Sequence, residues 1–180
     1  MSRDLFEPSV IFTRVFAMPN AATFSILPIA SLLGRYINDV KVVVDPFARF
    51  SQWGTLRNDL NPDTGAEYHM AAEGFVVHLD KIGTIADAVL FDPPYSPRQI
   101  SECYQKVGLP VTTETTQNAR LYKTVKDGLH KILKPGGMAI CCGWNSMGFG
   151  LKRGYQMKEI LMVAHGAAHN DTIVTVEEKL

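Results

Sequence analysis

Two short hydrophobic runs, each closed by an aspartate and then a proline, constrain the fold of this chain more than any other feature. The first covers residues 41–45 and ends at Asp45, and the second covers residues 86–92 and ends at Asp92. Short apolar runs without polar alternation are typical of strands that are buried on both faces of a parallel sheet. Because parallel strands need long crossover connections, which are usually helices, the two runs predict an α/β fold.

The rest of the chain supplies the expected alternation of helices and strands. We expect helices at residues 28–36, 99–107 and 119–133, and further strands at residues 55–59, 75–77, 138–142, 159–164 and 172–176. The sequence Lys134-Pro135-Gly136-Gly137 is expected to end the last helix. The last two strands are separated by a short connection, which favours an antiparallel pair with residues 172–176 at an edge of the sheet. The prediction is a mostly parallel sheet with an antiparallel C-terminal strand pair.

Length and composition bound the kind of protein. A chain of 180 residues, 46% of them hydrophobic, suits a single domain spanning residues 1–180. Eighteen basic and 18 acidic residues give a net charge of zero, which argues against a strongly basic nucleic-acid arm. No signal peptide or apolar stretch of membrane-spanning length is recognisable, so a cytoplasmic protein is expected. Three cysteines without CxxC spacing predict neither a disulfide framework nor a metal site.

The candidate site lies where the predicted strands end. Asp45, Asp59 and Asp92 each fall at such an end, and open α/β sheets bind ligands at the carboxyl ends of their strands. After Asp92 come two prolines, which fix the backbone and carry no N–H, and then Tyr95. Carbonyl and carboxylate acceptors beside an aromatic ring suit a planar group with an amino donor, such as the exocyclic amino group of a base. A rigid strand-to-loop turn without any ligand is the alternative.

These residues carry a family resemblance. The sequence Asp92-Pro93-Pro94-Tyr95 resembles the D-P-P-Y motif of S-adenosylmethionine-dependent amino-methyltransferases, which modify adenine N6 or cytosine N4 in DNA. Residues 45–47, 58–62 and 134–137 resemble the family's D-P-F cofactor motif, the acidic end of its second strand and the turn before its fifth strand. In this order the motifs resemble a phage-type adenine-N6 DNA methyltransferase, which implies a Rossmann-like methyltransferase fold and restriction-modification as the biological setting.

The resemblance implies a role for each matching residue. Asp92 and the carbonyl of Pro93 or Pro94 would accept hydrogen bonds from the target amino group, and Tyr95 would stack on an extruded base. Asp59 would bind the ribose hydroxyls of S-adenosylmethionine, and Asp45 and Phe47 would line its methionine side. The implied catalytic residues are thus Asp92, Pro93, Pro94 and Tyr95, and the implied cofactor-binding residues are Asn20, Thr23, Asp45, Pro46, Phe47, Asp59, Asn61 and Glu73.

The chain departs from the family pattern at two places. The family follows D-P-F with small residues and glycine, whereas this chain has Arg49 and Phe50, which are expected to obstruct the cofactor's approach to the backbone. The family also has an acid that contacts the adenine amine, where this chain has Ala71; Glu73 is the nearest acid. An acceptor lost opposite a buried donor costs about 1–3 kcal/mol.

Little of the chain is left for recognition of a DNA sequence. The insertion at residues 96–122, with Arg98, Lys106 and Arg120 and with Lys123 just beyond it, is the candidate for phosphate contacts. A homo-oligomer or a separate recognition subunit is the other possible source. Two alternatives to an adenine DNA methyltransferase stay open: a catalytically degenerate fold that binds nucleic acid or a partner, and an enzyme that methylates another amino group, in RNA or protein.

Overall fold

A computed structural model describes residues 10–112, 116–166 and 169–180. Its elements in chain order are β1 (Ile11–Phe16), η1 (Thr23–Ser25), α1 (Leu27–Ile37), β2 (Val43–Asp45), β3 (Leu56–Arg57), α2 (Ala72–Lys81), β4 (Ala86–Phe91), α3 (Pro97–Lys106), α4 (Asn118–Ile132), β5 (Leu133–Gly143), η2 (Leu151–Arg153), β6 (Tyr155–Ala164) and β7 (Thr172–Lys179). In the described part of the chain, no helix has the length and apolar character needed to cross a membrane.

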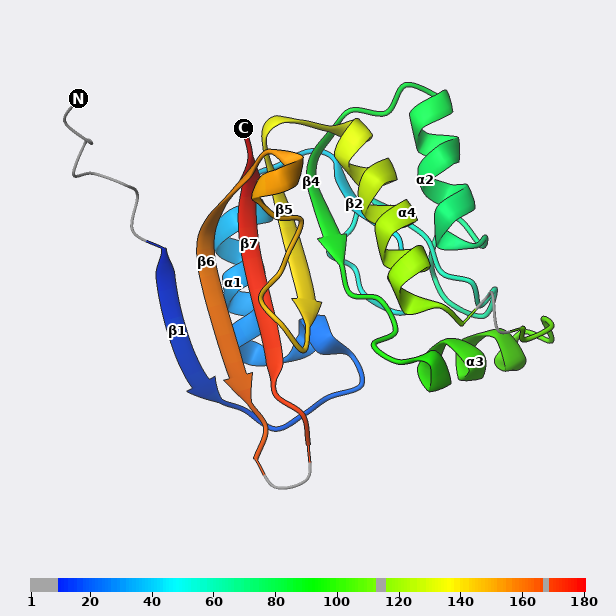
Figure 1. Cartoon of the computed structure of the whole chain (residues 1–180), viewed down its shortest axis with the longest axis horizontal. Coiled ribbons are helices and arrows are strands. Elements are labelled where there is room, and N and C mark those ends of the chain that lie inside the picture. The colour runs from blue at the N-terminus through cyan, green and yellow to red at the C-terminus, as the bar shows by residue number, and fades with distance from the viewer. Residues whose placement is uncertain (1–9, 113–115, 167–168) are drawn as a thin grey trace.

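The strands form one seven-stranded sheet in the order β1-β6-β7-β5-β4-β2-β3 (Figure 1). The pairs β1–β6, β2–β3, β2–β4 and β4–β5 are parallel. β7 runs antiparallel to both of its neighbours, β5 and β6. This arrangement confirms the predicted α/β class, with a mostly parallel sheet and an antiparallel C-terminal pair.

Helices cover the two faces of the sheet unequally. α1 packs on one face, whereas α2 and α4 pack on the other, over β2, β4 and β5 (Figure 1). Alternate residues of β4 serve the two layers: Ala88 and Leu90 contact the α1 layer, and Val89 and Phe91 contact the α2–α4 layer. Because residues 88–91 of β4 are buried on both faces of the sheet, they are all apolar instead of alternating.

The contact between α2 and α4 depends on a glycine. A Cβ atom added to Gly128 of α4 would lie 2.4 Å from Cγ2 of Val76 on α2. The two helices therefore approach each other closely only because position 128 has no side chain.

Two of the predicted local elements were wrong. Residues 75–77 belong to α2, in which Phe75, Val76 and Leu79 are buried together at helical spacing. An apolar run of three residues is too short to show a helical or a strand period, and here the residues on both sides of it are helical. The last helix does end just before residues 134–137, at Ile132, but these residues do not form a separate turn, because β5 begins at Leu133 and runs through them, with Gly136 at a φ of 73°.

The expected edge position of residues 172–176 was also wrong. β7 lies inside the sheet, between β5 and β6. The edge is formed by β1, which the sequence analysis did not predict, and on it Phe12 and Phe16 are exposed. The second predicted strand, at residues 55–59, is confirmed only in its middle, as the two-residue strand β3.

Candidate functional site

Three carboxylates converge at one edge of the sheet, as their strand ends predicted. Asp45 is the last residue of β2, Asp92 directly follows β4, and Asp59 lies two residues beyond β3. The three strands are parallel and adjacent, so their carboxyl ends meet. Burial is the main cause that raises the pKa of Asp45, and the charges of Asp92 and Asp59 add to it.

Two adjoining hollows open at this edge, with volumes of about 460 and 410 Å³. Ligand pockets usually fall between about 300 and 1,000 Å³. The hollows share one wall, made by Ala21, Thr23, Phe47, Arg49, Phe50 and Asp92. Most of the predicted site residues line the larger hollow, namely Thr23, Pro46, Phe47, Asp59, Asn61, Glu73, Asp92, Pro93, Pro94 and Tyr95. The two exceptions are Asn20, which lines the smaller hollow, and Asp45, which lines neither.

Asp45 lies beneath the hollows as a buried group. Its side chain is fully excluded from solvent, and its Oδ1 accepts a hydrogen bond of 3.1 Å from the N–H of Phe47. Its Oδ2 has no hydrogen-bond partner in the part of the chain that the structure describes. Burial is the main cause that raises the pKa of Asp45 to about 8, and the Phe47 hydrogen bond opposes that shift. Asp45 therefore holds the turn that presents Phe47 to the cavity.

Asn58, which the sequence analysis noted only as part of a motif, ties the site's loops together. Its buried side-chain amide donates to the carbonyls of Pro46 (3.1 Å) and Met70 (3.0 Å) and accepts from the N–H of Met70 (3.1 Å). Asp59 then accepts the backbone N–H of Asn61 on Oδ1 and that of Arg49 on Oδ2, both at 2.9 Å. These bonds fix the carboxylate of Asp59 on the wall of the larger hollow.

The sequence from Asp92 to Tyr95 also lines the larger hollow. The hydroxyl of Tyr95 donates to Oδ1 of Asp92. Burial raises the pKa of Asp92, whereas hydrogen bonds from Tyr95 and Thr23 and the charge of Arg49 oppose the shift. The carbonyl of Pro94 already accepts a hydrogen bond of 2.8 Å from the hydroxyl of Tyr122 in α4. Of the two proline carbonyls, only that of Pro93 has no recorded hydrogen bond among the described residues.

The start of α3 fixes the position of Tyr95. Ser96 caps this helix by accepting the N–H of Gln99 (3.2 Å), and Pro97 occupies its first turn. The side chain of Gln99 returns to accept the N–H of Tyr95. The Tyr95 ring lies 5.5 Å from the ring of Trp144, which follows β5 and is 46% exposed. An aromatic pair with one partly open member thus borders the site.

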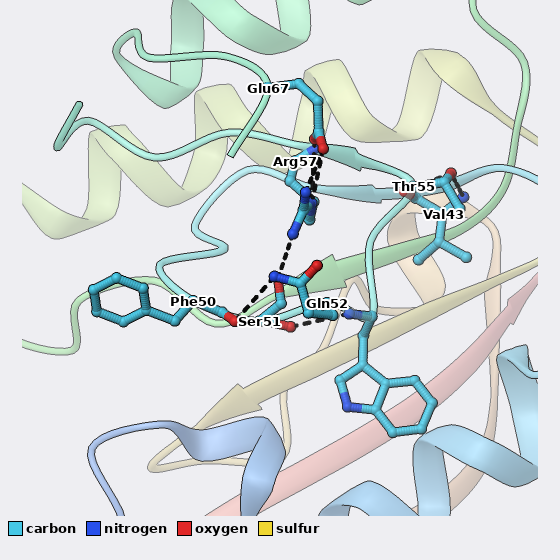
Figure 2. A network of polar contacts seen from close by, with 8 residues as sticks. Val43, Phe50, Ser51, Gln52, Thr55, Arg57 and Glu67 are labelled. Atoms are coloured by element: carbon cyan, nitrogen blue, oxygen red, sulfur yellow. Dashed lines mark hydrogen bonds and ion pairs between the residues drawn. The ribbon is translucent and has the colours of Figure 1, made fainter. Parts of the chain in front are cut away.

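Arg49 and Phe50 do not fill the cavity but form part of its wall. Figure 2 shows how the loop that carries them is held: Arg57 donates from Nη1 to the carbonyl of Ser51 (3.2 Å) and pairs with Glu67. Phe50 points away from this network and is 62% exposed. Arg49 and Phe50 each line both hollows, so the predicted obstruction of the cofactor stays a prediction.

The insertion at residues 96–122 holds α3 and the first turn of α4, and its residues 113–115 lie outside the described residues. Arg98 pairs with Glu102 at 2.9 Å, and Lys123 pairs with Asp127 at 2.8 Å. Lys106 lines the larger hollow. Within residues 10–112, 116–166 and 169–180, no cluster of three His, Cys, Asp or Glu side chains has the geometry to hold a metal ion.

Together, the strand order and the cavity at the carboxyl ends of β2, β3 and β4 define a Rossmann-like methyltransferase fold. No family model and no curated protein matches the sequence. Among solved structures, the chain is similar to TrmN from Thermus thermophilus, with a TM-score of 0.54 and 18% identity over 86% of this chain and 49% of that one. It is also similar to NSun6 from Pyrococcus horikoshii with SFG, with a TM-score of 0.55 and 14% identity over 82% and 50% of the two chains.

A third solved structure is closer in size. The N-methyltransferase NodS from Bradyrhizobium japonicum WM9, in complex with S-adenosyl-L-homocysteine, has a TM-score of 0.50 and 11% identity, over 83% of this chain and 84% of that one. By contrast, the chain spans about half the length of TrmN and NSun6. At these identities the likeness establishes the fold.

Proposed function

We propose that this protein transfers a methyl group from S-adenosylmethionine to the exocyclic amino group of a base in DNA, with adenine N6 as the target. One observation carries the proposal: Asp92, Pro93 and Tyr95 line the same hollow, and the hydroxyl of Tyr95 donates to the Asp92 carboxylate. The wall of the same hollow bears Asp59, the acid after the second strand of the cofactor half.

The residues around the hollows fit the cofactor. Asp59, Asn61 and Glu73 supply hydrogen-bond acceptors in the larger hollow, where ribose hydroxyls and an adenine amine would bind. Asn20 and Thr23 line the smaller hollow. S-adenosylmethionine supplies an electrophilic methyl group on a good leaving group, so the chain's own task is positioning. The complexed state of NodS, which shares the fold, supports this choice of cofactor.

The substrate amino group would be held by two acceptors. Since Tyr95 donates to Oδ1 of Asp92 and Thr23 also donates to this carboxylate, the incoming amino group would use the remaining lone pairs of Asp92 together with the carbonyl of Pro93. Two such bonds orient the nitrogen lone pair, while the Tyr95 ring stacks on the extruded base. DNA backbone contacts are assigned to the insertion at residues 96–122, with Lys106 nearest the cavity, or to a second subunit.

Methyl incorporation tests the proposal. Purified protein is incubated with S-adenosylmethionine carrying a tritiated methyl group and with DNA that lacks methylated bases, and the nucleosides are then separated. We expect label in N6-methyladenine, loss of label for Asp92→Ala, and retained label for Asp39→Ala, a carboxylate exposed near the end of α1. Label in N4-methylcytosine, or in RNA supplied instead of DNA, would move the target; label that persists in Asp92→Ala would overturn the site.

A catalytically silent fold that binds nucleic acid or a partner is the second candidate. Ala71, at the start of α2, lines the larger hollow at the place of the family's acid, and Arg49 stands at the place of a small residue. Calorimetric titration with S-adenosylmethionine separates the two functions, because the silent fold would show no binding at millimolar cofactor.

A further inference from the structure

Arg49 adopts a backbone conformation that favours glycine. Its φ is +47°, and it is the one non-glycine residue with positive φ in the described parts of the chain. This left-handed region is strained for a residue that carries a side chain. Two hydrogen bonds hold the loop in this conformation. The N–H of Arg49 donates to Oδ2 of Asp59, and Arg57 donates to the carbonyl of Ser51 (Figure 2). Glycine would meet the backbone requirement without this strain.

The side chain of Arg49 has few partners within the protein. Its Nη1 donates to the carbonyl of Ala21 at 2.6 Å. No ion pair with a carboxylate is recorded for it among residues 10–112, 116–166 and 169–180. A guanidinium has five N–H donors, so this group retains capacity for an anion. The cation therefore lines the cavity without a direct ion pair in the described residues, although its charge acts on the nearby carboxylate of Asp92.

The two hollows explain what such a cation would bind. Arg49 lies on their shared wall, and it is the sole basic residue among the described residues that line the smaller hollow. The proposed cofactor has an adenosine end, suited to the larger hollow with Asp59, and an amino-acid end, which bears its carboxylate. An elongated ligand that spans both hollows would bring that carboxylate to the side of Arg49.

We propose that Arg49 binds the α-carboxylate of the cofactor's amino-acid end and thereby replaces the close backbone approach that glycine gives. This inference rests on the proposed cofactor. A charge-assisted hydrogen bond to a planar guanidinium is stronger than one to a neutral backbone N–H and can be bidentate with a carboxylate. The strained backbone is then offset by ligand binding and not by the stability of the empty fold.

The test compares two ligands that share an adenosine thioether and differ at the amino-acid end. S-adenosylhomocysteine carries the amino-acid carboxylate and amino group, whereas 5′-methylthioadenosine has a methyl group in place of the whole amino-acid end. Both are titrated calorimetrically into the wild-type chain, Arg49→Gly and Arg49→Lys, with Arg14→Gln on the exposed strand β1 as the control. For Arg49→Gly we expect S-adenosylhomocysteine to bind about 10- to 150-fold more weakly and methylthioadenosine to change less than threefold. Arg49→Lys should recover part of the loss, and Arg14→Gln should match the wild type.

A second measurement excludes a folding defect. The thermal midpoint of ligand-free Arg49→Gly should equal or exceed that of the wild type, because the glycine relieves the strain at φ +47°. Equal weakening of both ligands would show that Arg49 acts structurally, through its hydrogen bond to Ala21, and not on the carboxylate. That result would overturn the role assigned to Arg49 and leave the proposed cofactor in place. A wild-type chain that binds neither ligand would overturn the proposed cofactor, and the assignment with it.

Discussion

The buried carboxylate of Asp45 should make the stability of this protein fall as pH rises. Its pKa is 3.8 as a free group and about 8 in the folded chain. Between these values the folded chain holds a proton that the unfolded chain has released, so the fold is favoured at low pH. This contribution is complete below about pH 4, is lost between pH 4 and 8, and is absent above that range.

The size of the effect follows from the exchange of one proton. One proton gives a slope of at most about 1.4 kcal/mol per pH unit, so the ceiling between pH 5 and 8 is roughly 4 kcal/mol. That is a large part of the roughly 5–15 kcal/mol by which domains are usually stable. Burial is the main cause of the raised pKa, and the charges of Asp92 and Asp59 add to it.

The assay is urea unfolding of the wild type and Asp45→Asn at pH 5, 6, 7 and 8. Asparagine keeps the oxygen that accepts the Phe47 N–H, at 3.1 Å in the wild type, and cannot ionise. Its amide nitrogen takes the place of the unpartnered Oδ2, which costs the variant a pH-independent amount. The wild-type free energy of unfolding minus that of Asp45→Asn should therefore fall steadily with pH. A difference that stays constant from pH 5 to 8, as we expect for the exposed control Asp39→Asn, would refute the reasoning.

Three further outcomes are expected. Gly128→Ala should lower the free energy of urea unfolding by about 1–2 kcal/mol, because overpacking against Val76 outweighs the gain in helix propensity. Adding Val76→Ala to the same chain should relieve the overpacking, and additive losses of stability would contradict this reasoning. Glu177→Ala should lower the thermal midpoint by the equivalent of at least about 2 kcal/mol, and Glu177→Gln by less, since this buried carboxylate accepts two backbone N–H groups after β5; equal losses would count against that role. Tyr122→Phe removes the donor to the Pro94 carbonyl and should slow methyl transfer by up to about tenfold with an unchanged cofactor KM; a raised KM would place Tyr122 in cofactor binding instead.

The sequence was informative where a residue's role follows from its place on an element. Apolar runs that end in Asp45 and Asp92 indicate buried parallel strands, and the edge they share follows from that. Contacts between distant segments left no such pattern. Nothing in the sequence around Tyr122 indicates that its hydroxyl reaches the Pro94 carbonyl, 28 residues away. The left-handed backbone of Arg49 was equally hidden, because the residue type argues against it.

The central position of β7 has a consequence for synthesis on the ribosome. Until residues 172–179 emerge, β1 and β6 form one group of strands, and β5, β4, β2 and β3 form another. Each group has an open edge where β7 will pair. The strands that carry the cavity belong to the second group, which is complete before β6 emerges, so this half is able to assemble before the sheet is joined. A chain stopped before β7 would retain both unpaired edges, which are templates for pairing with other chains. Translation of the last strand is thus the step that converts two aggregation-prone halves into one sheet.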